Sequence, residues 1–500
     1  MIRLLPRRGD LSGRKADLII HFQFEGEDFP ASATDPGFRK AISAVLRGDA
    51  FEGKADTSLL WHGRGPFPAA RYLVQGLGRR EAFGPEVLHR AAASAGSKAS
   101  ALRARRAGVA LAPPSAWGLK IEEAIRMAAG GFLHGGYRFD KYLSGAKPDG
   151  GPAELMVGTQ GAEPRSFGGL LREIVVEDRV VRLARDLVSE HPGYLHPRRM
   201  GEVARREARR AGIACRLMGE AELGRLGMGG MLGVSRGSDH PALLAHLRYR
   251  PRAGRSRKAP RVVLVGKGVT FDTGGISLKQ ADGMEAMKAD MSGSAAVLAT
   301  MLALPALKVP AEVHGLLMVV ENMPGGRAFR PGDILRMHNG KTVEIKSTDA
   351  EGRLILADGL SWACRSLKPD YLVDLATLSG ACVVALGPAC TGVMGNDERL
   401  VRGILRAAAE SGERMWQLPL YPEYREHIRS EVADVKNSGI RYGGAITAGL
   451  FLQEFVEQGV PWVHLDIAGP AYSESGYGYA PKGASGHGVR TLLRFLRTLS

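Results

Sequence analysis

The sequence has few cysteines and no C-x-x-C pair. Its four cysteines are Cys215, Cys364, Cys382 and Cys390, in a chain of 500 residues. This spacing argues against a disulfide framework and against a zinc site built from thiolates, so we expect reduced, mostly buried thiols. The sequence also lacks an H-E-x-x-H segment, which excludes the zinc-binding helix that this motif marks in metalloproteases.

Long hydrophobic runs are absent as well. No apolar run approaches the ~18 residues that crossing a bilayer requires. The first ten residues, MIRLLPRRGD, contain a proline and two arginines that interrupt any apolar segment. We therefore expect no signal peptide. These absences predict a cytoplasmic protein that does not enter membranes. The apolar fraction of 44% with 24% charged residues is typical of a globular protein, and the length predicts two or three domains.

The sequence has few acidic residues relative to its basic ones, and its formal net charge is +16. Clustered basic residues can neutralise nucleic-acid phosphates, and the densest clusters here are RREARRAG (205–212) and RYRPRAGRSRKAPR (248–261). The second cluster is interrupted by proline and glycine and has only one aromatic residue, Tyr249, so it lacks the series of aromatic residues on which successive bases stack. We therefore favour solubility over specific nucleic-acid binding as the role of this charge.

The first part of the chain alternates strand-like and helix-like segments. Residues 16–24 and 71–78 are short apolar strands, while 86–107 and 121–133 have helical spacing. A Gly- and Pro-rich stretch at 144–164 then interrupts the pattern. We predict an N-terminal α/β domain over 1–165 and a second α/β domain over 166–500, which begins with a linker helix at about 170–190.

The second part continues the alternation. An Asn-Gly pair at 339–340 between two apolar runs predicts a hairpin. Strands alternating with helices imply a mixed, mostly parallel central sheet covered by helices, with ligand sites at the carboxyl ends of its strands. The predicted strands are 261–271, 315–321, 370–378 and 462–469, and the predicted helices are 291–304 and 354–365.

Acidic residues occur where these strands end or helices begin. They are Asp272, Asp290, and the pair Asp349 and Glu351. Four carboxylates brought into one site raise one another's pKa unless cations neutralise them. Oxygen ligands suit hard or borderline ions such as Mg, Mn or Zn, so the pattern favours a two-metal hydrolytic site.

Three basic residues accompany the carboxylates. Lys267 lies inside a predicted strand, where a desolvated lysine beside a dication can lose its proton and become a ligand. Lys279 and Arg353 would supply positive charge where an oxyanion develops or a small anion is held. Any one of these residues alone is explained more simply by a surface ion pair. The four carboxylates and the three basic residues together favour a catalytic metal site.

Several motifs resemble those of the leucyl (cytosol) aminopeptidase family of two-metal exopeptidases. They are GKGVTFDTGGISLK, MKADMSG, STDAEGRLILADGL, DLATLSGACVVALG, GGAITAGLFLQEF and WVHLDIAGPA, and they cover most of 261–490. The resemblance makes 166–500 the catalytic metallopeptidase domain. It also implies a homohexamer in the cytoplasm that acts on peptides with a free N-terminus, with leucine and other apolar residues preferred.

The resemblance assigns roles residue by residue. It implies that Lys267, Asp272, Asp290 and Glu351 bind one metal ion, and that Asp272, Asp349 and Glu351 bind the second. The two divalent ions per subunit would be Mn or Zn, with Mg or Co as the alternatives. Lys279 would polarise the scissile carbonyl, and Arg353 would hold a bicarbonate ion that acts as general base.

The resemblance is less specific about the pocket for the substrate side chain. It implies that Met287, Thr377 and Gly380 line this pocket and that the loop around Ala484 closes it. Methionine fills core gaps more often than it recognises a substrate. The chain also departs from the family pattern, with Ser347 in place of the usual asparagine and with HPGYLHP (191–197) lacking the usual asparagines.

Other functions were weighed against this one. GVSRG (233–237) fits the nucleophile elbow of serine hydrolases, but that motif belongs between a strand and a helix, and we expect a loop here. Asp272-Thr273-Gly274 is how an acid protease presents its aspartate, but it occurs once and leaves the other carboxylates unexplained. We expect His464, which lies in a predicted strand, to be a buried core residue rather than a metal ligand. A narrow dipeptidase with the same site, and a basic non-catalytic DNA-binding oligomer, are the remaining alternatives.

Overall fold

The computed structural model describes residues 2–29, 35–63, 65–145, 151–160, 166–251, 259–476 and 482–499. The chain forms two compact units. The first comprises Met1–Arg182 with Ala409–Gly412, and the second comprises Leu183–Ala408 with Glu413–Ser500. Parts of the Gly- and Pro-rich stretch and of the basic stretch at 248–261 lie outside the described residues.

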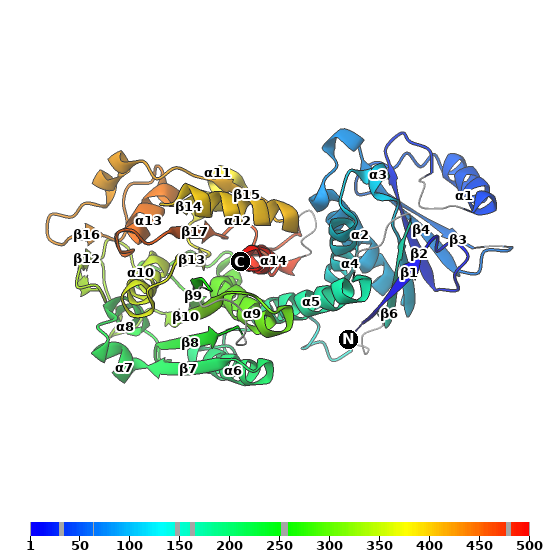
Figure 1. Ribbon diagram of the computed structural model, residues 1–500. Helices are drawn as coiled ribbons and strands as arrows, with labels where there is room; N and C mark the ends of the chain where they lie inside the picture. Colours follow the sequence, from blue (N-terminus) through cyan, green and yellow to red (C-terminus); the bar gives the residue numbers. More distant parts are fainter. Residues whose placement is uncertain are drawn as a thin grey trace. The chain divides into compact units, whose positions relative to one another are not determined.

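The first unit is built on a six-stranded sheet in the order β1-β6-β5-β2-β4-β3 (Figure 1). All neighbouring strands are parallel except β3 and β4, which are antiparallel. The strands are β1 (Arg3–Arg8), β2 (Leu18–Phe24), β3 (Ser58–His62), β4 (Arg71–Gly78), β5 (Arg106–Ala110) and β6 (Glu154–Thr159). The helices are α1 (Pro36–Gly48), α2 (Pro85–Ala101), α3 (Pro114–Trp117), α4 (Ile121–Gly135) and α5 (Phe167–Ser189), with a short 3-10 turn η1 (Arg80–Ala82).

Both faces of this sheet are covered, which explains why β2 is apolar without interruption. Leu18, Ile20 and Phe22 pack into the cluster that contains α2 and α4. Ile19 packs into the opposite cluster, which contains Phe38 of α1. Successive side chains of a strand point to opposite faces, so a sheet buried on both sides needs a continuous apolar run.

The predicted helix 86–107 is wrong at its end. α2 stops at Ala101, and the backbone of Arg103 adopts a positive φ of 52°. A left-handed residue breaks a right-handed helix, and the chain then enters β5 at Arg106. β1 and β6 were not predicted, because one is rich in arginine and proline and the other lies within the Gly- and Pro-rich stretch.

The second unit is built on an eight-stranded sheet in the order β15-β14-β17-β13-β9-β10-β8-β7. Its four central strands, β17, β13, β9 and β10, are parallel, which confirms the predicted mixed, mostly parallel sheet. The large strands are β7 (Ala214–Gly219), β8 (Leu243–Tyr249), β9 (Arg261–Asp272), β10 (Glu312–Asn322), β13 (Tyr371–Ala376), β14 (Thr391–Gly395), β15 (Met415–Gln417) and β17 (Trp462–Asp466). Two small sheets are formed by β11 (Ile334–Arg336), β12 (Thr342–Glu344) and β16 (Val435–Lys436), and by β18 (Tyr472–Ser473) and β19 (Gly483–Ala484).

Helices cover both faces of this sheet as well. Val263 and Val265 of β9 pack with Leu354 and Leu356 of α10 on one face. On the other face α9 approaches β9 so closely that a Cβ on Gly266 would lie 2.6 Å from Ser294 Cα. The helices and turns are α6 (Pro197–Ala211), α7 (Glu220–Arg225), α8 (Gly229–Ser235), η2 (Met284–Ala289), α9 (Ser292–Leu307), α10 (Gly352–Trp362), η3 (Ala363–Leu367), α11 (Gly380–Leu386), α12 (Glu398–Ser411), η4 (Pro422–Ile428), α13 (Gly444–Gln453) and α14 (Val489–Thr498).

Two local predictions have clear outcomes. The Asn-Gly hairpin is confirmed, because β11 and β12 are antiparallel on either side of it and Gly340 has a positive φ of 93°. The loop expected at 233–237 is largely helical, since Ser235 is the last residue of α8 and is buried. A nucleophile elbow needs a serine on an exposed strand-to-helix turn, so this serine does not fit the motif.

One helical stretch of the described chain, Met284–Leu307, has the length and composition of a membrane span, contrary to the sequence-based expectation. However, 83% of its most apolar window is buried inside the fold. A helix that is apolar on all sides can be the core of a large protein, and α9 occupies that position here.

Candidate metal centre

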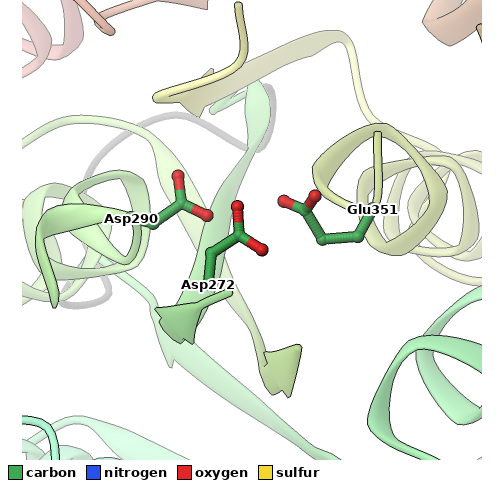
Figure 2. Close-up of side chains that lie close together, drawn as sticks. All are labelled: Asp272, Asp290 and Glu351. Atoms are coloured by element: carbon green, nitrogen blue, oxygen red, sulfur yellow. The ribbon is translucent and has the colours of Figure 1, made fainter. Parts of the chain in front are cut away.

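Three carboxylates from three separate elements meet at the carboxyl end of β9. Asp272 is the last residue of β9, Asp290 ends η2 just before α9, and Glu351 is the N-cap of α10. All three are buried, and one oxygen of each lies within 4.8 Å of the others. Figure 2 shows their carboxylates pointing toward one another. The carboxyl ends of parallel strands are where such sheets hold ligands.

Lys267 of β9 lies between two of these carboxylates. Its Nζ is 2.7 Å from Asp290 Oδ1 and 2.9 Å from Glu351 Oε1. The same Nζ donates a hydrogen bond of 2.9 Å to the carbonyl oxygen of Thr377, directly after β13. A buried lysine therefore sits where a cation would contact both carboxylates.

Lys279 connects the third carboxylate to Asp349. Its Nζ lies 2.9 Å from Asp272 Oδ2 and also forms an ion pair with Asp349 Oδ1. The Asp349 side chain is 38% exposed, whereas that of Asp272 is 3% exposed. Asp349 thus forms the solvent-facing edge of the acidic cluster.

Burial and like charge dominate the electrostatics of the centre. Burial raises the pKa of Asp290 well above its usual value, and Lys267 only partly opposes this shift. Burial, followed by the charge of Asp272, also raises the pKa of Glu351. Burial alone would lower the pKa of Lys267, but the carboxylates of Asp290, Glu351 and Asp272 together raise it. The cluster therefore binds positive charge strongly.

The donor atoms fit divalent metal ions. Asp272, Asp290, Asp349 and Glu351 outnumber the ammonium groups of Lys267 and Lys279 by two, so one dication would balance the charge. Asp290 Oδ2 is buried and has no hydrogen-bond partner among the described residues. A buried oxygen without a partner is costly unless something else binds it, and carboxylate oxygens are ligands for Mg, Mn and Zn.

Two buried asparagines that the sequence analysis missed hold this centre in place. Asn322, at the end of β10, donates from Nδ2 to Asp272 Oδ1 at 2.8 Å and to the carbonyl oxygen of Thr348 at 3.0 Å. Asn437, just after β16, donates from Nδ2 to the carbonyl oxygen of Ser347 at 2.6 Å. Asn437 Oδ1 accepts from the backbone N–H of Lys346 at 2.8 Å. No local sequence pattern marks either residue, because each forms its hydrogen bonds with a loop that is distant in the sequence.

Arg353 approaches the centre from the first turn of α10. It is 9% exposed, and burial lowers the pKa of its guanidinium to about 10. Its Nη1 donates to the carbonyl oxygen of Asn437 at 2.8 Å, while its buried Nε has no partner among the described residues. An unpaired N–H on a buried cation can bind a small anion.

The remaining predicted residues differ in their exposure and in their contacts. Thr377 Oγ1 donates to Asp290 Oδ1 at 2.8 Å, so Thr377 contacts the acidic cluster directly. Met287 is half-buried in η2, and Gly380 is exposed at the start of α11. Ala484 is buried in β19, where its carbonyl oxygen accepts from Arg185 Nε at 2.8 Å, and residues 477–481 before it lie outside the described residues.

Ser347 and His464 have structural roles. Ser347 Oγ accepts a hydrogen bond of 3.2 Å from the backbone N–H of Asp349, so the shorter side chain still closes this turn. His464 of β17 is fully buried and its Nδ1 lies 2.6 Å from Asp374 Oδ1, which confirms the prediction that it is a core residue.

Family models match most of the chain. The catalytic domain of the cytosol aminopeptidase family matches residues 182–493, and the N-terminal domain of the same family matches residues 20–146. A probable cytosol aminopeptidase of Geobacter sp. is 45% identical over 449 residues, covering 89% of each chain. Another from Aquifex aeolicus is 39% identical over 494 residues, covering 99% of this chain and 98% of the relative.

Solved structures are similar over nearly the full length. The bottromycin maturation enzyme BotP, determined in complex with Mn, has a TM-score of 0.85 and 38% identity, covering 97% of this chain and 99% of BotP. A mutant of tomato leucine aminopeptidase has a TM-score of 0.89 and 32% identity, covering 100% of this chain and 97% of the tomato chain.

Proposed function

Because the chain belongs to the cytosol aminopeptidase family and is a leucyl-aminopeptidase-type metallo-exopeptidase, we propose that two divalent ions per subunit occupy the acidic centre. Lys267, which would lose its proton as the ion binds, would hold one ion together with Asp272, Asp290 and Glu351, and Asp272, Asp349 and Glu351 would hold the other. The observation that carries this proposal is the convergence of three buried carboxylates to within 4.8 Å. Mn or Zn is favoured over Mg or Co, and BotP was determined with Mn.

The protein groups have distinct tasks in this proposal. Bound divalent ions would supply Lewis-acid polarisation of the scissile carbonyl and a water of lowered pKa. Lys279 places its ammonium beside Asp272 and Asp349, where it donates a hydrogen bond to the carbonyl oxygen as negative charge develops. Ion pairs with both carboxylates orient this ammonium before the substrate arrives.

Arg353 provides an anion site next to the centre. Its buried Nε is unpaired among the described residues, and its Nη1 is tied to Asn437. We assign to this site a bicarbonate ion, which Arg353 would hold and which would supply a general base. The arginine itself, with a pKa of about 10, stays protonated at neutral pH and so cannot be the base.

Substrate selection follows from the metal ions in this proposal. The free α-amine of a peptide N-terminus would bind one of the two ions, and an internal peptide bond offers no such amine. Met287, Thr377 and Gly380 form the pocket for the first side chain, with leucine and other apolar residues preferred. Thr377 is the member that contacts the acidic cluster, through Asp290.

The assembly and location complete the proposal. We assign a homohexamer in the cytoplasm, with residues 166–500 as the catalytic domain. Exposed apolar side chains of the second unit, among them Val384 at 89% and Tyr442 at 79%, are candidates for burial between subunits. Sedimentation analysis tests this assembly, and a monomer at micromolar concentration would contradict it.

Hydrolysis of leucine p-nitroanilide tests the two-metal reaction. The purified protein is stripped with chelator, assayed, and reconstituted separately with Mn, Zn, Mg or Co, while bound metal is counted by mass spectrometry. We expect activity to disappear on stripping and to return as the second ion binds. Full activity in the stripped protein, or at one ion per chain, would overturn the assignment.

A further inference from the structure

The first unit contains a basic hollow that the peptidase reaction does not use. It has a volume of about 380 Å³ and lies at the β1 edge of the six-stranded sheet. Figure 1 shows β1 and β6 side by side at this edge. Five cationic side chains line it, from Arg3, Arg7, Arg14, Lys15 and Arg106.

Sheet register explains why these side chains converge. Arg3 of β1 and Arg106 of β5 are both in register with Glu154 of β6, so the two arginines flank one carboxylate. Residues two apart on a strand share a face, and Arg7 therefore lies on the same face as Arg3. Leu5 and Met156 are also in register with each other. They form an apolar floor between Arg7 and the row made by Arg3, Glu154 and Arg106.

A turn places the other two cations over the same face. Two glycines, Gly108 and Gly158, leave room for Leu11, whose side chain lies 2.6 Å from a Cβ built on Gly158. Arg14 donates its backbone N–H to the Leu11 carbonyl oxygen at 2.9 Å, which closes the turn. The side chains of Arg14 and Lys15 therefore belong to an anchored turn.

The charge of the hollow is poorly compensated. Glu154 lies 2.9 Å from Arg106 Nε and 3.8 Å from Arg3 Nη1, so its charge is shared between them. Arg7, Arg14 and Lys15 form no ion pair with any described carboxylate. Five like charges around one concavity repel one another, and a multiply charged anion relieves this repulsion.

We propose that this hollow binds a phosphate-bearing ligand of the nucleotide type. Arginine matches the geometry of phosphate oxygens, and three or more cations can contact one or two phosphates together. The floor of Leu5 and Met156 suits a flat apolar group attached to the phosphates, and the volume is in the range of small-ligand pockets. No aromatic side chain lines the hollow among the described residues, so stacking of successive bases is not its mode of binding.

Two kinds of ligand present such phosphate groups, a free nucleotide and the backbone of a nucleic acid. Isothermal titration of the metal-loaded full chain with adenosine 3′,5′-bisphosphate, and separately with a short DNA duplex, distinguishes them at low and at physiological salt. The test variant is Arg14→Glu with Lys15→Glu. The matched control is Arg39→Glu with Lys40→Glu, which changes the same charge on exposed positions of α1 in the same unit. Aminopeptidase activity checks that both variants are folded.

We expect the bisphosphate to bind the wild type, the test variant to bind it about tenfold more weakly or worse, and the control to keep its affinity within about twofold. Binding of the duplex alone, lost in the test variant but not in the control, would support the phosphate site and identify the backbone as its source. The proposal is overturned if neither probe binds, or if the test variant and the control lose affinity equally.

Discussion

Asn322 fixes the orientation of Asp272. The side-chain amide of Asn322 donates to Asp272 Oδ1 at 2.8 Å, and the backbone N–H of Gly274 donates to the same oxygen at 2.9 Å. Asp272 Oδ2 is left to face Lys279. One oxygen of this carboxylate is thus held by the scaffold while the other faces the centre.

Replacing Asn322 with alanine should loosen the centre. We expect metal affinity to fall about 10- to 100-fold, because a carboxylate ligand loses the partner that orients it. Metal titration followed by calorimetry measures the change, and saturating metal should restore part of the rate. Asn396→Ala is the control, since this side chain also forms two hydrogen bonds, but to the backbone groups of Val460 and Trp462 and to no carboxylate of the centre. Equal metal affinity in the two variants would contradict the role.

Glu351→Ala should abolish turnover. Glu351 is buried and faces both Lys267 and the other carboxylates. In the proposed assignment, its loss would remove a ligand shared between two ions. We expect activity below about 1% of wild type and reduced bound metal. Leucine p-nitroanilide hydrolysis and metal counting on the same sample provide the measurement. Appreciable residual turnover with full metal content would refute the bridging role.

Arg353→Ala should separate catalysis from metal binding. The guanidinium contacts a backbone carbonyl and presents an unpaired Nε, but it contacts no carboxylate of the cluster. We expect kcat to fall at least about tenfold with metal content unchanged. Added bicarbonate should stimulate the wild type more than the variant. Loss of bound metal instead would mean that Arg353 is structural.

Gly352→Ala should displace Lys267. A Cβ on Gly352 would lie 2.5 Å from Lys267 Cε and 2.7 Å from its Nζ, so the lysine must move away from Asp290 and Glu351. We expect activity to fall about tenfold or more with little loss of stability, because the clash involves the end of a flexible side chain. Gly130→Ala in α4, where a Cβ meets nothing within 4 Å, is the matched control. Wild-type activity of the first variant would show that Lys267 does not need this position.

The pair of His464 and Asp374 should make stability depend on pH. Burial opposes the charge on His464, but Asp374 outweighs it and raises the histidine pKa above its usual value. The folded state then binds this proton more tightly than the unfolded state. The stabilisation is complete below about pH 6.5 and is lost as pH rises through the folded-state pKa.

Denaturant unfolding of wild type and His464→Gln between pH 6 and 9 isolates this effect. Burial lowers the pKa of His246, His314 and His487, so these histidines make stability increase with pH. Their contribution is the same in wild type and variant, and it cancels when the two unfolding free energies are subtracted. We expect the free-energy difference between the two proteins to shrink as pH rises. A difference that is constant over this range would exclude the charged pair.

Elements with strong local signals were predictable from the sequence. β9 was found because its run of β-branched residues is buried on both faces, and the hairpin at Gly340 because the turn requires a positive φ. β1, β5 and β6 were missed. Proline in β1 and alanine and glycine in β5 are weak strand formers, and β6 lies within the Gly- and Pro-rich stretch. The pairing of these three strands with one another stabilises them.

The sequence alone was enough to propose which residues carry the chemistry, because Lys267, Asp272, Asp290, Asp349 and Glu351 lie in motifs that resemble those of the cytosol aminopeptidase family. Tertiary structure decided how these residues meet. Packing of α9 and α10 on opposite faces of one sheet brings Asp290 and Glu351 to the end of β9. The tertiary fold also positions Asn322 and Asn437 to orient the centre. It brings the cations of β1, of β5 and of the turn after Leu11 around one hollow, since a buried hydrogen bond or a shared sheet edge depends on residues far apart in the chain.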